Sequence, residues 1–401
     1  MVNTFQFAPT PKIIFGAGYF AKLPEIISER GDNILLITGG SSLRESGYYQ
    51  QLVNSLQKKV LFLDDVRISG EPSPDRIDEL SDKYRDKSLD LVVAIGGGSV
   101  VDAGKAVSAM LTCEESVMAF LEGVGEGKIH SGEKVPFIAV PTTSGTGSEA
   151  TKNAVLSRVG KDGFKKSLRH DNFIPDLALV DPELTVNCPS GITAASGMDA
   201  ISQLLGAYLS TEAFSITDSL ILKALELAGN SYLPVCTTEA ENVEARAGMA
   251  YASLISGIVL ANAGLGIVHG LASPVGGFFD IPHGVVCGTL LAEAVKMNIE
   301  HLSLENSTDK IYLNKYANAG ALLTGKARAD NLDIAPDEIS DYCRLLIDTL
   351  ERWTEEVEMP ELGEYGITEE DLPRIAENTG NKNNPIKLSN EQIIDLLESR
   401  L

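Results

Sequence analysis

The sequence predicts an N-terminal α/β nucleotide-binding domain with a parallel sheet, followed by an all-α C-terminal domain. Its 401 residues are too many for one typical core, and the 44% hydrophobic content is sufficient for two. Short apolar runs alternate with helical patterns in the first half. Strand-like runs stop near residue 190, and long helical patterns follow. These observations together indicate two domains of different classes.

The predicted strands of the first half are short, apolar and mostly bounded by Gly, Pro or Asp, as strands buried on both faces are. Early segments at 4–7 and 12–15 are expected to form a hairpin beside the sheet. Alternating strands and helices imply parallel strands with crossover helices. The expected strands are 34–38, 60–63, 91–95, 137–140 and 177–180, with helices at 43–58, 74–84 and 99–111.

The second half carries helical patterns, among them 192–209, 216–231, 240–261 and 336–355. Residues 181–190 (DPELTVNCPS) mix turn-forming residues with little periodicity, so the boundary is placed there. We therefore expect an α/β domain over 1–185 and a helical domain over 186–401.

Charge and cysteine usage exclude several classes of partner. Lys and Arg total 33 against 56 Asp and Glu, a net charge of −23, which disfavours nucleic acid and anionic lipid. The five cysteines form no framework spacing, which suggests free thiols in a reducing compartment. The N-terminus lacks the apolar core of a signal peptide, and apolar stretches break before the ~20 residues of a membrane span. We expect a cytoplasmic protein.

A glycine-rich segment follows one predicted strand. Residues 91–105 read LVVAIGGGSVVDAGK, so an apolar strand runs through three glycines into a helix predicted to start at Ser99. Glycines let a phosphate approach the backbone, and a helix N-terminus attracts negative charge. Ser99 fits the N-cap position, with Asp102 as its capping-box-like partner. The spacing is not GxGxxG, and a tight turn without a ligand is the alternative.

A second polar loop favours the nucleotide interpretation. Residues 141–149, PTTSGTGSE, hold five hydroxyl side chains and two glycines directly after another predicted strand. Two such loops at the carboxyl ends of one sheet suit an extended ligand such as a dinucleotide.

Two histidines and an aspartate are candidate metal ligands. His269 and His283 lie in the segment GLGIVHGLASPVGGFFDIPHG, and Asp199 lies in an otherwise apolar helical pattern. Imidazole nitrogens with a carboxylate form a site for iron or zinc with open positions. Gln203 lies one helical turn after Asp199, on the same face. The alternative is that Asp199 only caps a helix or forms a salt bridge.

These motifs resemble those of the iron-containing (group III) alcohol dehydrogenases, within the dehydroquinate synthase-like fold. The resemblance runs from KIIFGAG at 12–18 to about residue 300, through AIGGGSVVDAGKA, VPTTSGTGSEAT, LVDPELT, SGMDAISQLLGAY and the histidine segment. It implies that Gly97, Gly98 and Ser99, with Asp102 beside them, hold the pyrophosphate. It places Leu184 against the cofactor. The other implied residues are Thr142, Thr143, Thr146, Thr151 and Lys165 around adenosine, ribose and nicotinamide, and Asp199, Gln203, His269 and His283 at the metal.

Three departures from the family pattern bear on metal and cofactor. Gln203 stands where most iron-dependent members have His, and Ser273 stands where many have a second His. The remaining triad resembles that of zinc-dependent glycerol dehydrogenases, so the metal is expected to be Fe²⁺ or Zn²⁺. Gly39 stands where NAD-preferring members often carry an Asp that repels a 2′-phosphate. Gly39, Gly40, Ser41 and Ser42 offer uncharged donors, so we expect NAD(P), with a preference for NADP.

The sequence thus predicts a metal-dependent alcohol dehydrogenase or aldehyde reductase that transfers a hydride between nicotinamide and a small alcohol or aldehyde. The identity of that substrate is left open. We expect a homo-oligomer, a dimer. The alternatives are a metal-independent reductase like the maleylacetate reductases, a lyase of the dehydroquinate synthase type, and a non-catalytic nucleotide-binding protein.

Overall fold

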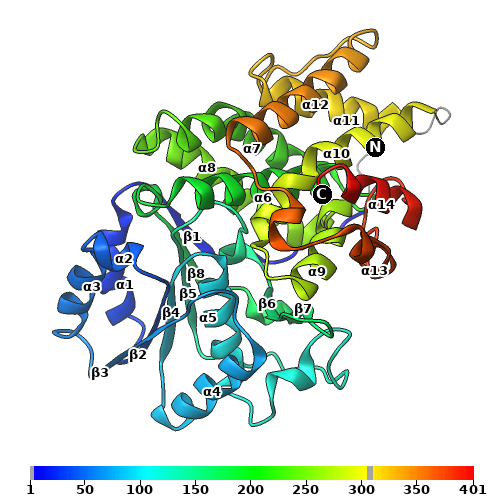
Figure 1. The fold of residues 1–401 in the computed structure, drawn as a ribbon. Helices are drawn as coiled ribbons and strands as arrows, with labels where there is room; N and C mark the ends of the chain where they lie inside the picture. Colours follow the sequence, from blue (N-terminus) through cyan, green and yellow to red (C-terminus); the bar gives the residue numbers. More distant parts are fainter. Residues whose placement is uncertain (1–3, 305–309) are drawn as a thin grey trace.

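A six-stranded parallel sheet organises the first half of the chain. The computed structural model describes residues 4–304 and 310–401. Within them the sheet has the order β1-β8-β5-β4-β2-β3, and every neighbouring pair is parallel. Figure 1 shows this sheet beside the helical half of the molecule. The strands are β1 (Lys12–Phe15), β2 (Asn33–Thr38), β3 (Phe62–Arg67), β4 (Leu91–Gly96), β5 (Phe137–Pro141) and β8 (Leu177–Val180).

Alternate residues of the strands enter two different cores, because successive side chains point to opposite faces of a sheet. Leu35 and Val92 pack with one set of helices, whereas Leu36 and Val93 pack with the other. Figure 1 shows these sets on opposite sides of the sheet. The first set is α4 (Pro74–Tyr84) and α5 (Gly98–Met110), and the second is α1 (Leu23–Ser28), α2 (Ser42–Glu45) and α3 (Tyr48–Leu56).

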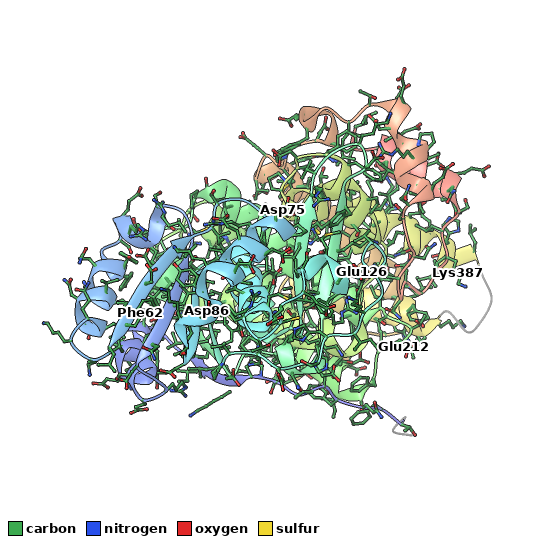
Figure 2. All side chains as sticks on the ribbon, turned by 90° about the horizontal axis from the view of Figure 1, so that it is seen from below. Phe62, Asp75, Asp86, Glu126, Glu212 and Lys387 are labelled. Carbon is green, nitrogen blue, oxygen red and sulfur yellow. The ribbon has the colours of Figure 1, made fainter. Side chains whose placement is uncertain are left out.

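The helical half surrounds one large apolar core. Its helices follow one another from residue 190 to the end of the chain. They are α6 (Ser190–Tyr208), α7 (Ser215–Cys236), α8 (Val243–Ala263), α9 (Ile267–Phe278), α10 (His283–Leu304), α11 (Lys310–Leu323), α12 (Ile339–Glu356), α13 (Leu372–Glu377) and α14 (Asn390–Glu398). Seen from below, Figure 2 shows Phe62 and Asp86 in the α/β half and Glu212 and Lys387 in the helical half.

Helix α8 is long and apolar enough to cross a membrane by length and composition alone. However, 72% of its most apolar 18-residue window is buried within the protein, and the helix packs against α6 and α7. Such burial is typical of the core helix of a soluble domain.

Three predicted elements of the first half need correction. The 4–7 and 12–15 hairpin is wrong: β1 pairs in parallel with β8, and Phe5 instead stacks on Phe214 with ring centroids 4.6 Å apart. The helix at 43–58 is broken into α2 and α3, because Gly47 adopts a left-handed φ of 81° at the start of α3. The strand at 60–63 lies later in the chain, as β3.

An antiparallel pair, β6 (Asn153–Arg158) with β7 (Phe164–Arg169), was not predicted. Its strands carry several charged residues, so the long apolar run that identifies a buried strand is missing. This hairpin reaches the helical half: the Gly160 amide donates to the Gly277 carbonyl of α9 at 3.2 Å. The β6–β7 hairpin therefore connects the α/β half of the chain to helix α9.

The strand order points to a candidate nucleotide site at the carboxyl ends of β2 and β4. The chain runs from β2 outward to β3, then crosses back to β4 and continues in the other direction through β5 and β8. In open parallel sheets, ligands bind in the crevice at such a reversal of strand order.

The loop after β5 contacts the helical half through two glycines. Gly147, with φ of 59°, lies against Gly257 of α8, and a Cβ added at Gly257 would lie 2.1 Å from the Gly147 carbonyl oxygen. Gly257→Ala should therefore displace this loop and lower the free energy of unfolding by about 1–3 kcal/mol, as overpacking does. Chemical denaturation measures this change.

The matched control is Gly191→Ala in the first turn of α6, where an added Cβ meets no atom within 4 Å. Alanine favours helices over glycine by up to ~1 kcal/mol, so this variant should be as stable as the wild type or more so. Equal stability of the Gly257→Ala protein and the wild type would contradict the close approach of the loop to α8.

Candidate active site

Three loops meet at the carboxyl edge of the sheet. Thr38 is in register with Ile95, and Gly96 is in register with Pro141, so the segments after β2, β4 and β5 are neighbours. The Thr142 amide donates to the Gly96 carbonyl at 2.9 Å. The two polar loops predicted from the sequence are thus brought together.

The glycines of the first loop allow the second loop to approach it. A Cβ on Gly98 would lie 2.6 Å from the Thr146 side chain, whereas a Cβ on Gly97 would lie 3.5 Å from Thr143. Helix α5 begins at Gly98 and its N-cap is Gly97, with no side-chain cap. The prediction that Ser99 caps this helix is therefore wrong, because the helix starts one residue earlier and Ser99 lies in its first turn.

Asp102 does not complete a capping box either, because its carboxylate bonds to the loop after β5 and to strand β6. It accepts hydrogen bonds from the Ser148 hydroxyl and from the Val155 amide, the latter at 3.1 Å. Lys105 lies one turn later and donates to Thr151 Oγ1 at 2.9 Å. Burial lowers the pKa of Lys105 to about 8. Asp102 and Thr151 thus make hydrogen bonds within the chain that fix the loop after β5. Their contact with the cofactor stays a prediction.

The segment after β2 is uncharged but has two arginines beside it. Gly39 is partly exposed, and Gly40, Ser41 and Ser42 are exposed. Arg67 donates to the Gly40 carbonyl at 2.9 Å. Arg44 pairs with Asp65 at 2.6 Å.

A small hollow joins this segment to the second loop and to the segment after β8. Ser42, Thr142 and Leu184 all line it. Leu184 lies in the 3-10 helix η6 (Pro182–Thr185) and is buried. Three predicted cofactor-contacting residues from distant parts of the sequence therefore lie around one cavity.

The candidate metal ligands converge from three helices. Asp199 of α6, His269 of α9 and His283 at the start of α10 bring their ligand atoms into one group. His269 Nε2 lies 3.1 Å and His283 Nε2 lies 3.8 Å from the same oxygen, Asp199 Oδ1. Asp199 is 1% exposed, and within the described ranges the two imidazoles are its only ion-pair partners.

The electrostatics of the group suit a bound cation. Burial alone would raise the pKa of Asp199, but His283, His269 and a hydrogen bond from Gln203 outweigh it and hold the pKa below its ordinary value. Desolvation, aided by the positive charge of Lys165, lowers the pKa of His283 to about 4. At neutral pH the site thus offers a carboxylate and a neutral imidazole, the forms that bind metal. The residues present therefore fit a divalent metal.

Gln203 faces the group but is already hydrogen-bonded. Its amide bonds to Asp199, and its Oε1 accepts from the Ser256 hydroxyl at 3.2 Å. The same hydroxyl lies 3.4 Å from the Gly145 carbonyl in the loop after β5. Gln203 thereby connects the candidate metal site to the candidate nucleotide loop, and its role as a metal ligand stays a prediction.

Lys165 of β7 lies beside His283 and forms an ion pair with Glu71, which follows β3. Ser273, at the position where the family resemblance led us to expect a histidine, donates from its hydroxyl to the Lys165 carbonyl at 3.2 Å. Position 273 therefore supports the hairpin that carries Lys165 and supplies no imidazole.

Comparisons with known proteins identify the family of the chain. Residues 9–182 match the iron-containing alcohol dehydrogenase family, and residues 193–401 match the C-terminal part of the Fe-containing alcohol dehydrogenase family. The chain is 31% identical to the NAD-dependent methanol dehydrogenase of Bacillus methanolicus over 375 residues, 92% of this chain and 91% of that protein.

Solved structures share the fold over its whole length. The alcohol dehydrogenase from Oenococcus oeni aligns with a TM-score of 0.84 and 29% identity, over 99% of this chain and 100% of that one. The sulfoacetaldehyde reductase from Bifidobacterium kashiwanohense, in complex with NAD⁺, aligns with a TM-score of 0.82 and 26% identity, over 99% of each.

The chain belongs to the iron-containing alcohol dehydrogenase family. It is a metal-dependent oxidoreductase that uses a nicotinamide cofactor and acts on the CH–OH group of a small alcohol, or on the aldehyde in reverse. The predicted fold, a parallel-sheet domain with a helical domain, is confirmed.

Sequence reasoning missed one residue of this alcohol dehydrogenase's metal group. Cys287 lies four residues after His283 in HGVVC and contributes a fourth ligand-type atom, all four lying within 4.8 Å of one another. The spacing i, i+4 places both side chains on one helix face, and that signal was available in the sequence. Arg67 was also missed, because its nearness to Gly40 depends on the pairing of β2 with β3.

Gly97→Ala tests the nucleotide loop of this alcohol dehydrogenase. An added Cβ meets only ordinary contact with Thr143, so the free protein should keep its melting temperature. The methyl group would project at the start of α5, where a phosphate must approach the backbone. The Kd for NAD(P)H should rise roughly tenfold or more, about 1.4 kcal/mol. Fluorescence titration of NAD(P)H measures it.

Gly98→Ala is the comparison variant, because its Cβ meets Thr146 within the protein itself. It should lower both melting temperature and cofactor affinity. Unchanged affinity in Gly97→Ala would place the pyrophosphate elsewhere.

Proposed function

We propose that this alcohol dehydrogenase holds its divalent metal on Asp199, His269 and His283 and prefers NADP(H) to NAD(H). The observation that supports the metal site is the convergence of two imidazole nitrogens on one buried carboxylate oxygen, at 3.1 and 3.8 Å. No Lys or Arg in the described ranges pairs with Asp199, which favours a metal site over a purely structural salt bridge.

The proposed site has one side from which substrate can enter. His283 has 25% of its side chain exposed, whereas Asp199 and His269 have 1% and 7%. A metal there would act as a Lewis acid on the substrate oxygen, and the nicotinamide would carry the hydride. The protein's own residues position these groups: Gln203 orients Asp199, and Ser273 fixes the strand that carries Lys165.

Lys165 and Glu71 have properties that suit the proton side of the reaction. Their ion pair lies beside His283, and the Glu71 side chain is 31% exposed. Because position 273 has no imidazole, we propose that protons leave the site through solvent or a ribose hydroxyl along this partly open side.

Charge near Gly39 supports the preference for NADP(H). No acidic side chain replaces glycine there, and the guanidinium of Arg67 lies against the Gly40 carbonyl. Arg44 is stacked on Tyr49 with its charge offset by Asp65, whereas Arg67 forms no ion pair in the described ranges and so leaves a positive charge against the loop. A 2′-phosphate is favoured by such surroundings.

We place the domain division at 185/186 and propose a cytoplasmic homodimer. Free thiols support the compartment. The edge strand β1 supports association, since among the described residues it pairs with β8 alone and leaves Ile13 37% exposed. Light scattering after gel filtration tests the dimer.

Asp199→Asn tests the metal site. The amide keeps the shape but removes the negative charge, so metal content and turnover should both fall by more than the ~10–100-fold typical of outer-shell partners. Chelation of the wild type should abolish turnover, and zinc or iron should restore it. Elemental analysis and steady-state rates of each sample measure the two effects.

Asp218→Asn is the matched control. Asp218 forms an ion pair with Lys315, with 2.9 Å between the two atoms, and it does not belong to the candidate metal group. It should keep its metal. Full activity of the chelated wild type would support the metal-independent reductase, and turnover of substrate without net change in cofactor would support the lyase.

Gly39→Asp tests cofactor preference. The carboxylate would repel a 2′-phosphate and bond a 2′-hydroxyl, so the ratio of kcat/KM for NADP(H) over NAD(H) should fall roughly tenfold or more, about 1.4 kcal/mol. Gly39→Ala is the control: it introduces the same close contact with Val100, at 3.2 Å from the added Cβ, without the charge. The proposed preference would be refuted if the wild type had an equal or higher kcat/KM with NAD(H) than with NADP(H).

A further inference from the structure

We infer that Cys287 is a fourth protein ligand of the metal, bound as a thiolate, and that it makes this site select zinc over iron. The inference rests on the proposed metal site of Asp199, His269 and His283. It concerns a residue for which the sequence motifs of the site assign no role.

The position of Cys287 follows from helix geometry. His283 begins α10, and Cys287 lies four residues later on the same face, so both side chains point toward Asp199 and His269. The sulfur lies 3.7 Å from His269 Nε2 and 3.7 Å from His283 Nε2. Cys287 is 0% exposed, so its thiol has no access to solvent as an alternative partner.

These separations are close to those of a tetrahedral zinc site. With Zn–S of about 2.3 Å and Zn–N of about 2.0–2.1 Å, tetrahedral angles separate sulfur from nitrogen by about 3.5–3.6 Å. The same geometry separates nitrogen from oxygen by about 3.3–3.4 Å. The observed sulfur–nitrogen distances are 3.7 Å, and the nitrogen–oxygen distances of 3.1 and 3.8 Å fall on either side of the second value.

Gln203 competes poorly for the fourth place, because a neutral amide oxygen is a harder and weaker ligand for zinc than a thiolate. The Gln203 amide bonds to Asp199 and to the Ser256 hydroxyl, and the Cys287 thiol bonds to Asp199 and Ser202, but the Cys287 sulfur also lies 3.7 Å from both imidazole nitrogens. A buried cysteine ordinarily packs as a small apolar residue. This sulfur instead lies among two ring nitrogens and a carboxylate, the surroundings of a ligand.

Coordination balances the charge of the group. When the metal binds, the thiol releases its proton to solvent and the sulfur lone pair forms the bond to the metal. Asp199 and the thiolate then carry two negative charges against the two positive charges of the ion. Thiolate is a soft ligand that favours zinc over iron, and catalytic zinc can take a fifth ligand when substrate binds.

X-ray absorption at the zinc edge tests the inference on the full-length, zinc-loaded enzyme. The wild type should show one sulfur neighbour at about 2.3 Å together with nitrogen and oxygen neighbours at about 2.0–2.2 Å. Cys287→Ser should lose the sulfur neighbour. Cys113→Ser, which replaces a cysteine of the α/β half three residues after the end of α5, should keep it.

A competition assay measures selectivity independently of turnover. Zinc and ferrous iron are offered together to the metal-free protein, and the bound ratio is determined by elemental analysis. Cys287→Ser should lower the preference for zinc by roughly tenfold or more, since even outer-shell partners change affinity ~10–100-fold. Cobalt(II) loading adds a spectroscopic check: a thiolate-to-cobalt charge-transfer band should be present in the wild type and absent in Cys287→Ser.

The outcomes separate this inference from the proposed function. Bound zinc with only nitrogen and oxygen neighbours in the wild type would overturn the role of Cys287 and leave the three-ligand site intact. Failure of the wild type to bind any metal would overturn the metal site itself. The wild-type spectrum requires no substitution, so misfolding of a variant cannot obscure the result.

Discussion

The buried carboxylate of Asp199 is the constraint on which the catalytic half of this alcohol dehydrogenase depends. A lone ionised carboxylate in an apolar helical core is costly unless it is paired and hydrogen-bonded. Asp199 is 1% exposed, and the surrounding imidazoles and the Gln203 amide nevertheless keep its pKa below its ordinary value. The carboxylate therefore fixes the relative positions of α6, α9 and α10. A bound cation would complete this compensation and stabilise the fold by mass action.

The same carboxylate is connected to the nucleotide loops of the other domain. Gln203 bonds to Asp199 and accepts from Ser256, whose hydroxyl also lies 3.4 Å from the Gly145 carbonyl. Contact between Gly147 and Gly257 holds the same loop against α8. Placement of the candidate cofactor loop relative to the proposed metal ligands is thus set by short polar and glycine contacts, and small changes in them should alter binding of cofactor and metal together.

The sequence was sufficient for the main architecture because buried parallel strands are identified by their composition. The runs at 34–38, 91–95, 137–140 and 177–180 correspond to β2, β4, β5 and β8. The charged strands β6 and β7 lack that signal. Residues 4–7 and 12–15 look like a hairpin locally, but the partner of β1 is β8, more than 160 residues away, and local patterns do not encode such pairing.

The sequence predicted which side chains converge at the candidate metal site, but not the contacts that surround them. Residue chemistry and then the family resemblance pointed to Asp199, His269 and His283, which the fold brings together. The hydrogen-bond partners of Gln203, the capping of α5 by Gly97 and the nearness of Arg67 to Gly40 depend on tertiary packing. Cys287 is different, because its spacing from His283 is visible in the sequence. A cysteine four residues after a histidine does not indicate a metal site by itself, and only the fold shows that Asp199 and His269 lie beside this pair.

Anomalous diffraction from crystals of the zinc-loaded enzyme tests the central claim most directly, because it locates the metal without reference to activity. We expect one strong zinc peak per chain, surrounded by Asp199, His269 and His283. A peak elsewhere in the chain, or no peak in fully loaded protein, would contradict it.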